Sequence, residues 1–292
     1  MRRNARFFIL GVLFCMSCSR QAPDTLFRTS GFAEVNGTKL HYEAAGSGDA
    51  VVFIHGGFAD LRQWDDQTAA FSKGHRVIRY DLRGYGKSAL PDTNAPYSHH
   101  EDLKALLDFL GIRQAHVCGQ SFGSAVAADF AVAHPERCLS YIPVGPYLFG
   151  WPSPLKQELN AVLAQVDSVY RRQGKKAAVD FTCEHPFFQM GKEAAQTFKR
   201  IGTDYSFWHY DNRDPFKPLN PPAREQIQDI RIPTLIVTAD NDLPLCREIA
   251  GVLEGTIAGS RKAVIRGGGH DINVNMPLAF NQVVLDFLKR RR

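Results

Sequence analysis

A serine between two glycines is the residue of this chain best placed for covalent chemistry. The pentapeptide Gly119-Gln120-Ser121-Phe122-Gly123 follows an apolar segment that predicts a strand, Ala115 to Cys118, and begins a small-residue segment that predicts a helix. A sharp turn from strand to helix exposes the serine hydroxyl, and the glycines let the backbone bend without a Cβ clash. Because a glycine-rich turn with a solvated serine has the same pattern, the interpretation depends on the partners available to Ser121.

A nucleophilic serine needs a base, and His270 is the candidate. It follows Gly267-Gly268-Gly269, between the last predicted strand and the last predicted helix. Three glycines allow a tight loop that turns the imidazole back toward the serine, where it would accept the hydroxyl proton and return it to the leaving group. The chain has ten histidines, and a surface histidine in a loop is the alternative interpretation.

The base in turn needs a carboxylate that orients it, and two aspartates compete for this role. Asp240 and Asp242 both follow the apolar segment Thr234 to Thr238, which predicts a strand. One of them would bond the imidazole, and the other would cap the turn or the following helix. No carboxylate occurs from Tyr141 to Trp151, which excludes an acid just after the preceding predicted strand.

The oxyanion that forms in such a reaction needs backbone N–H donors. His55-Gly56-Gly57-Phe58 follows the apolar segment Val51 to Ile54, and its turn can present the amide of Gly57 beside the amide of Phe122. One such donor typically contributes about 3 kcal/mol to stabilisation of the transition state. We expect His55 itself to have a structural role.

All these residues follow predicted strands, in a chain that alternates strand and helix patterns. Such alternation is typical of an α/β protein with a mostly parallel central sheet and helices on both faces. Asn36-Gly37 predicts a hairpin turn near its beginning. The predicted strands are 32–35, 40–43, 51–54, 75–80, 115–118, 139–144, 234–237 and 263–265, and the predicted helices are 60–72, 98–110, 122–133, 245–254 and 277–289.

Residues 147–225 break this alternation and predict a helical insertion. They are rich in aromatic residues and end in a proline-rich stretch, Pro215 to Pro222. Most of the aromatic side chains must form the core of the insertion, which we expect to pack over one edge of the sheet. A few that face the cleft would make an apolar substrate pocket.

The N-terminus has the pattern of an export signal. Three arginines among the first six residues precede the apolar run Phe7 to Phe14, which is too short for a membrane span of about 20 residues. A small residue before Cys18 resembles the lipobox of bacterial lipoproteins, although Cys15 stands where leucine is usual. We therefore expect a signal peptide at 1–17, acylation of Cys18, a polar tether at 18–30 and a location in the bacterial cell envelope, with simple cleavage into the periplasm or an uncleaved anchor as alternatives.

The formal net charge of +5 belongs to the two ends of the chain. Without the N-terminal arginines, 32 basic residues face 30 acidic ones, and Lys289 to Arg292 form a basic tail suited to an anionic membrane surface. The nearly neutral body has no basic stripe with interleaved aromatic residues, so we expect no nucleic-acid partner.

Cys118, Cys138, Cys183 and Cys246 lack the spacing of a disulfide framework or of a zinc-type C-x-x-C pair. We expect Cys118 to be a buried free thiol, and pairing among the others stays open.

The order serine, aspartate, histidine along the chain, with the serine turn and the H-G loop, resembles the α/β-hydrolase superfamily over roughly residues 32–290. Further marks of this family are Trp64, nine residues after His55, and the segment Asp81 to Ser88. The family places its acid a few residues beyond the apolar run of the strand, which favours Asp242.

The resemblance implies the α/β-hydrolase fold, with a core formed by 31–146 and 226–292 and a helical cap at 147–225. It is similar to the capped branch that contains esterases, lactonases and C–C bond hydrolases. Haloalkane dehalogenases and epoxide hydrolases carry an aspartate where Ser121 stands. Proline iminopeptidases and C–C bond hydrolases usually have other residues around the H-G-G turn, so an ester is the favoured substrate.

The implied activity is that of a serine hydrolase without metal or cofactor, acting on a small acyl compound with an apolar portion. Ser121 would attack, His270 would carry the proton, Asp242 would orient His270, and the amides of Gly57 and Phe122 would hold the oxyanion. The alternatives are a catalytically silent binding lipoprotein, and peptidase, lactonase, C–C hydrolase, perhydrolase or acyl-transfer activity on the same triad.

Overall fold

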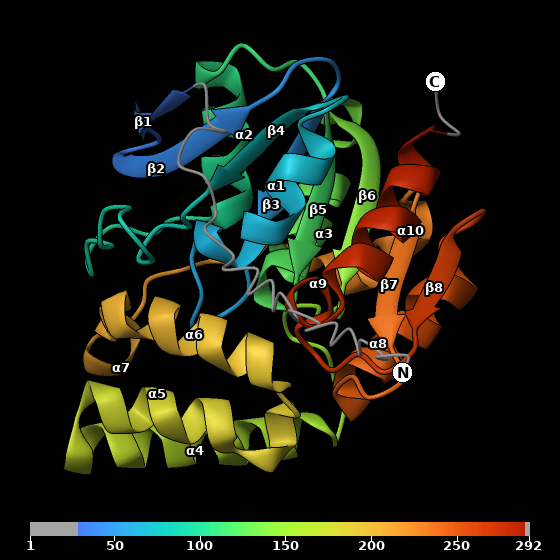
Figure 1. Ribbon diagram of the computed structural model, residues 1–292. Helices are drawn as coiled ribbons and strands as arrows, with labels where there is room; N and C mark the ends of the chain where they lie inside the picture. Colours follow the sequence, from blue (N-terminus) through green and yellow to red (C-terminus); the bar gives the residue numbers. More distant parts are fainter. Residues whose placement is uncertain (1–28, 290–292) are drawn as a thin grey trace, which may run out of the picture.

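The computed structural model describes residues 29–289, and its centre is an eight-stranded sheet (Figure 1). The strands are β1 (Thr29–Val35), β2 (Thr38–Ala45), β3 (Ala50–Ile54), β4 (Arg76–Tyr80), β5 (Ala115–Gln120), β6 (Cys138–Val144), β7 (Leu235–Ala239) and β8 (Arg261–Ile265). They lie in the order β1-β2-β4-β3-β5-β6-β7-β8. β2 is antiparallel to both β1 and β4, and all other neighbours are parallel. The predicted mostly parallel sheet is confirmed.

Helices cover both faces of the sheet, and each face has its own apolar core. The helices of this part are α1 (Asp65–Phe71), α2 (His99–Phe109), α3 (Phe122–Ala133), α8 (Pro244–Thr256), α9 (Ile272–Asn275) and α10 (Pro277–Lys289). Alternate side chains of a strand point to opposite faces. Val51 and Phe53 of β3 therefore join the core under α1 and α10, whereas Val52 and Ile54 join the core under α2, α3 and α8.

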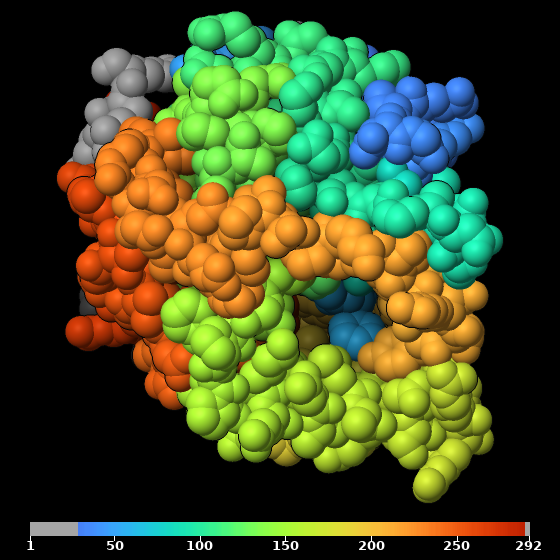
Figure 2. Space-filling view, turned by 180° about the vertical axis from the view of Figure 1, so that it is seen from behind, coloured from blue at the N-terminus to red at the C-terminus, as the bar shows by residue number. Residues whose placement is uncertain are grey.

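Between β6 and β7 the chain forms a helical cap. It contains α4 (Lys156–Gln173), α5 (Lys175–Glu184), α6 (Lys192–Asp204) and α7 (Trp208–Asp211), with a short 3₁₀ turn η4 (Pro186–Phe188). Figure 1 shows these helices as a separate layer beyond the carboxyl ends of the parallel strands. In the space-filling view a hollow opens between cap and core, and atoms of the early, blue part of the chain are visible inside it (Figure 2).

Some boundaries differ from those expected. β1 begins at Thr29, inside the predicted tether, because its backbone pairs with β2 from Ala44 onward. The predicted helix 60–72 is divided into a 3₁₀ turn, η2 (Leu61–Trp64), and α1. Four further short 3₁₀ turns are η3 (Pro135–Arg137), η5 (Ala223–Glu225), η6 (Ile227–Asp229) and the η4 turn of the cap.

Several predictions concern chain ends and cysteines. The predicted signal peptide, Cys18, most of the tether and the last three residues of the basic tail lie outside the described residues. Within residues 29–289 no helix has the length and apolar character needed to cross a bilayer. Cys118 is a buried free thiol, as expected, and the same holds for Cys138, Cys183 and Cys246.

Candidate active site

Ser121 occupies a strained turn between β5 and α3. Its backbone has φ 53° and ψ −115°, a region that L-residues rarely adopt and that is typical of functional turns. The flanking glycines are required by close packing instead of by unusual backbone angles. A Cβ on Gly119 would lie 2.1 Å from the carbonyl oxygen of Gly123, and a Cβ on Gly123 would lie 2.4 Å from that of Ile54. Their absence lets α3 begin directly against the sheet.

The structure brings the three predicted side chains together in one hydrogen-bonded chain. Nε2 of His270 lies 2.9 Å from Oγ of Ser121, and Nδ1 lies 2.7 Å from Oδ1 of Asp242. His270 is 7% exposed and Asp242 is 1% exposed, so the second bond is shielded from water. With the proton of neutral His270 on Nδ1, that nitrogen donates to Asp242 and Nε2 can accept the proton of the serine.

The two competing aspartates have different surroundings. The second oxygen of Asp242 accepts a hydrogen bond from Thr238 Oγ1 at 3.0 Å, which fixes the carboxylate toward His270. Asp240 is exposed and accepts the amides of Asn241 and Gly267, so it holds the two loops and does not contact the imidazole. Of the two aspartates that the residue pattern left open, the structure therefore places Asp242, and not Asp240, against the imidazole.

The electrostatic environment of His270 favours a charged imidazole. Its burial lowers the pKa, but Cys246 and Asp242 raise it, and the net pKa lies well above the ordinary 6.5. Burial raises the pKa of the Cys246 thiol, so the thiol is neutral at neutral pH. The charge that stabilises imidazolium at that pH is therefore the carboxylate of Asp242.

The two predicted oxyanion donors, Gly57 and Phe122, follow the neighbouring parallel strands β3 and β5. Phe122 is the first residue of α3, and helix geometry leaves the N–H groups of the first turn without partners inside the helix. In the loop after β3 the amide of Gly56 donates to Gln63 Oε1 at 2.8 Å, and a Cβ added to the next residue, Gly57, would meet no atom within 4 Å. His55 has the expected structural role, because its two ring nitrogens bond Gly56 O and the amide of Leu82.

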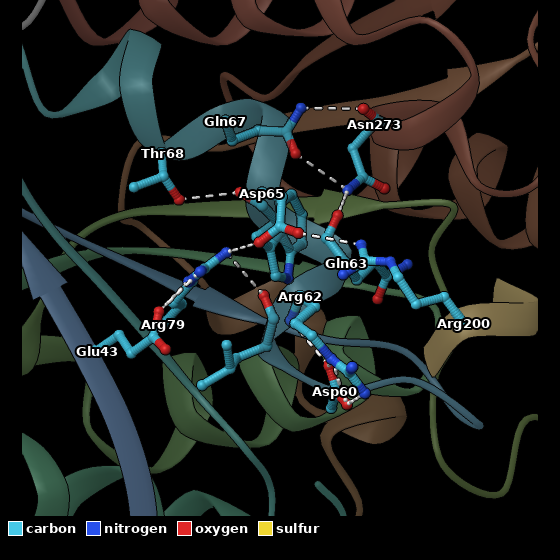
Figure 3. A network of polar contacts seen from close by, with 12 residues as sticks. Glu43, Asp60, Arg62, Gln63, Asp65, Gln67, Thr68, Arg79, Arg200 and Asn273 are labelled. Carbon is cyan, nitrogen blue, oxygen red and sulfur yellow. Dashed lines mark hydrogen bonds and ion pairs between the residues drawn. The ribbon is translucent and has the colours of Figure 1, made fainter. Parts of the chain in front are cut away.

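A buried pair of amide side chains joins the three loops of the site and was not anticipated from sequence. Gln63 Oε1 accepts the amide of Gly56, and Gln63 Nε2 donates to Gln120 Oε1 at 3.1 Å. Gln120 Nε2 donates in turn to the carbonyl of His270 at 3.1 Å. Asn273 Nδ2 adds a bond to the carbonyl of Gln63 at 2.9 Å (Figure 3). The loops that carry the predicted oxyanion donors, Ser121 and His270 are thus joined to one another by hydrogen bonds.

The cap is connected to the same region by ion pairs. Arg62 of η2 lies 2.9 Å from Asp204 at the end of α6, and Arg200 of α6 lies 3.1 Å from Asp65 of α1. Asp65 also pairs with the buried Arg79 of β4, so the link continues into the sheet (Figure 3). No motif marks these residues in the sequence, since their partners are distant along the chain.

Aromatic rings surround the turns that carry the oxyanion donors. Phe58, next to Gly57, contacts Tyr205 and Tyr210 of the cap at ring-centroid distances of 5.8 Å. Phe122 contacts Phe149 at 5.2 Å, and further aromatic residues extend this group. All but Tyr205 are only partly buried, as expected for rings that line an opening.

The family model for the alpha/beta hydrolase fold matches residues 49–277, most of the described chain. The chain belongs to this family. The fold and the residue pattern agree with the match.

Three similar proteins illustrate the range of activities found with this fold. The 2-hydroxy-6-oxo-6-phenylhexa-2,4-dienoate hydrolase of Comamonas testosteroni is 36% identical over 129 residues, 40% of this chain and 45% of that protein. The alignment thus spans less than half of that relative. The crystal structure of an enol-lactonase from Burkholderia xenovorans has a TM-score of 0.70 at 25% identity, over 89% of this chain and 100% of the other. A bromoperoxidase from Bacillus anthracis reaches 0.72 at 26% identity with the same coverage.

Proposed function

We propose that this hydrolase cleaves a carboxylic ester or a related acyl compound through an acyl-enzyme on Ser121. The observation that carries the proposal is the continuous hydrogen-bonded chain from Ser121 Oγ through His270 to Asp242. A serine hydroxyl is a weak nucleophile, and a base within hydrogen-bonding distance, oriented by a third group, is what activates it.

The reaction begins when Ser121 Oγ attacks the carbonyl carbon and its proton passes to His270 Nε2. The carboxylate of Asp242 stabilises the imidazolium. The amides of Gly57 and Phe122 bind the oxyanion of the tetrahedral intermediate. Return of the proton from His270 to the leaving group breaks the scissile bond, and a water activated by the same imidazole then releases the acyl group.

The substrate we propose is a small or medium acyl compound with an apolar portion. The support is the group of aromatic side chains beside the two turns, in which Phe58 is next to Gly57 and Phe122 is next to Ser121 along the chain. A lactone is the second candidate, because an enol-lactonase shares the fold over nearly the whole chain. The same triad would also serve a C–C bond hydrolase, as in the Comamonas relative, and a catalytically silent binding protein is the remaining alternative.

The decisive experiment is hydrolysis of p-nitrophenyl esters of increasing acyl length by the wild type and by Ser121→Ala. We expect the variant to keep its circular dichroism spectrum and to lose turnover by about 10⁴-fold or more. A fluorophosphonate probe should label the wild type at Ser121 and leave the variant unlabelled. Undiminished turnover in the variant would contradict the mechanism, and a folded wild type that the probe does not label would favour the silent binding protein.

We also propose that the protein is exported and held at the membrane by a lipid on Cys18. The support is the charged and apolar pattern of residues 1–17, followed by a small residue before the cysteine. The basic tail at Lys289 to Arg292 would add electrostatic attraction to anionic lipids to the anchoring by the lipid chains.

A further inference from the structure

Cys246 lies beside the catalytic triad, although no step of the hydrolysis uses it. It is in the first turn of α8, four residues after Asp242, and only 2% of its surface is exposed. A sulfur, nitrogen or oxygen atom from each of Cys246, His270 and Asp242 lies within 4.8 Å of the other two.

These three donors have the composition of a metal site. A thiolate, an imidazole nitrogen and a carboxylate oxygen are the ligands that zinc prefers, and cadmium shares its affinity for sulfur. Asp271, next to His270, adds a further buried carboxyl group. Its Oδ2 has no hydrogen-bond partner among the described residues, so this oxygen is a further buried acceptor beside the three donors.

We propose that Asp242, Cys246 and His270 form a binding site for Zn²⁺ or a similar thiophilic divalent cation, and that its occupation switches the hydrolase off. The switching half of this inference rests on the proposed function, whereas the binding half does not. The site differs from a catalytic metal centre because the ion would take the place of the hydrogen bond on which hydrolysis depends.

The rearrangement required is small. In the structure Nδ1 and Oδ1 are 2.7 Å apart, whereas two ligands of a tetrahedral Zn²⁺ at bond lengths of about 2.0 Å are about 3.3 Å apart. The pair must therefore open by about 0.6 Å, which a change of the carboxylate torsion angle can supply. The thiol loses its proton to solvent when sulfur binds the ion, and the carboxylate exchanges its hydrogen bond for a metal bond.

Coordination of the ion by either ring nitrogen of His270 prevents the imidazole from acting as a base. If the ion binds Nδ1, the proton of the neutral imidazole moves to Nε2, which can no longer accept the proton of Ser121. If the ion binds Nε2, the lone pair that would accept the serine proton forms the bond to the metal instead. Inhibition is therefore expected whichever nitrogen coordinates, and it should be reversed by a chelator.

The inhibition experiment compares the full-length wild type with Cys246→Ala and Cys246→Ser. Cys138→Ala serves as the matched control, because Cys138 is also buried and free. It is the first residue of β6, whereas the triad lies at the carboxyl ends of the strands. Each protein hydrolyses a p-nitrophenyl ester under increasing ZnCl₂, and inhibition is expressed relative to its own activity. We expect both Cys246 variants to need at least about tenfold more zinc for half inhibition, and the Cys138 variant to match the wild type.

A second measurement is independent of activity. CdCl₂ is added to Ser121→Ala and to the double variant Ser121→Ala/Cys246→Ala, and the ultraviolet absorption of the cadmium–thiolate bond is recorded. A band that depends on Cys246 supports the site, even if the wild type proves inactive toward every ester and the proposed function fails. Equal zinc inhibition in wild type and Cys246 variants, or a cadmium spectrum unchanged by the loss of Cys246, would overturn the proposal.

Discussion

Replacing Gln120 with leucine removes one half of the buried amide pair that joins the three active-site loops. Both members of the pair, Gln63 and Gln120, are 1% exposed, so water cannot replace a lost partner. In Gln120→Leu the Nε2 group of Gln63 and the carbonyl of His270 each lose the bond that they make to Gln120. In Gln63→Leu the amide of Gly56 and Oε1 of Gln120 lose theirs.

The cost of each change follows from the number of buried polar groups that it leaves unpaired. One such group costs about 1–3 kcal/mol, so each single variant should lose about 2–6 kcal/mol of unfolding free energy. The double variant also leaves two groups unpaired, the Gly56 amide and the His270 carbonyl. Gln63 Nε2 and Gln120 Oε1, which bond each other in the wild type, are both absent from it. It should therefore be about as stable as either single variant, and not twice as destabilised.

Urea unfolding followed by tryptophan fluorescence measures these free energies, and ester hydrolysis on the same samples measures the effect on the site. We expect kcat to fall by about 10- to 100-fold in the single variants, because the oxyanion and histidine loops shift relative to the serine. Gln282→Leu is the control, since Gln282 is exposed on α10 and bonds only Asp286; it should change stability by less than about 0.5 kcal/mol. Additive losses in the double variant would refute the reasoning.

Two further predictions concern the pH dependence of stability and the location of the protein in the cell. Asp129 of α3 is buried, which raises its pKa to about 6, while the amide of Leu219 lowers it. The folded protein therefore holds this proton more tightly than the unfolded chain with its pKa of 3.8, and stability falls as pH rises through about 4 to 6. Asp129→Asn should be more stable than wild type at about pH 8, by up to about 3 kcal/mol, and equal to it near pH 3, as urea midpoints would reveal. Cys18→Ser should move the protein from the membrane to the soluble fraction of the cell envelope and abolish labelling by a fatty acid; membrane retention of an unlabelled wild type would contradict lipidation.

The elements that carry the triad could be predicted because their signals are local. The apolar run before Ser121 and the small residues after it specify a strand, a turn and a helix within 20 residues, and α3 runs from Phe122 to Ala133 as expected. The same is true of the hairpin at Asn36-Gly37. Periodicity and turn chemistry are properties of short segments, so one sequence is enough to read them.

The contacts that hold the loops together could not be predicted, because they join residues far apart in the chain. Gln63 and Gln120 are separated by 57 positions, and Gln120 and His270 by 150. Glutamine has no propensity that marks it as a core residue, and its usual place is the surface. Cys246 likewise gives no local sign of its neighbour His270, which approaches it only when β7 and β8 pair.

The order of strands explains why a residue without a side chain lies between Ser121 and its two partners, Asp242 and His270. Ser121 follows β5, Asp242 follows β7 and His270 follows β8, so β6 lies between the serine and its partners. The imidazole must therefore cross the end of β6 to reach Ser121. The residue there is Gly145, with φ +50°, and a Cβ on it would lie 3.2 Å from the ring of His270. A side chain at this position would crowd the imidazole and would also have to adopt a left-handed backbone conformation, so a glycine fits the turn after β6.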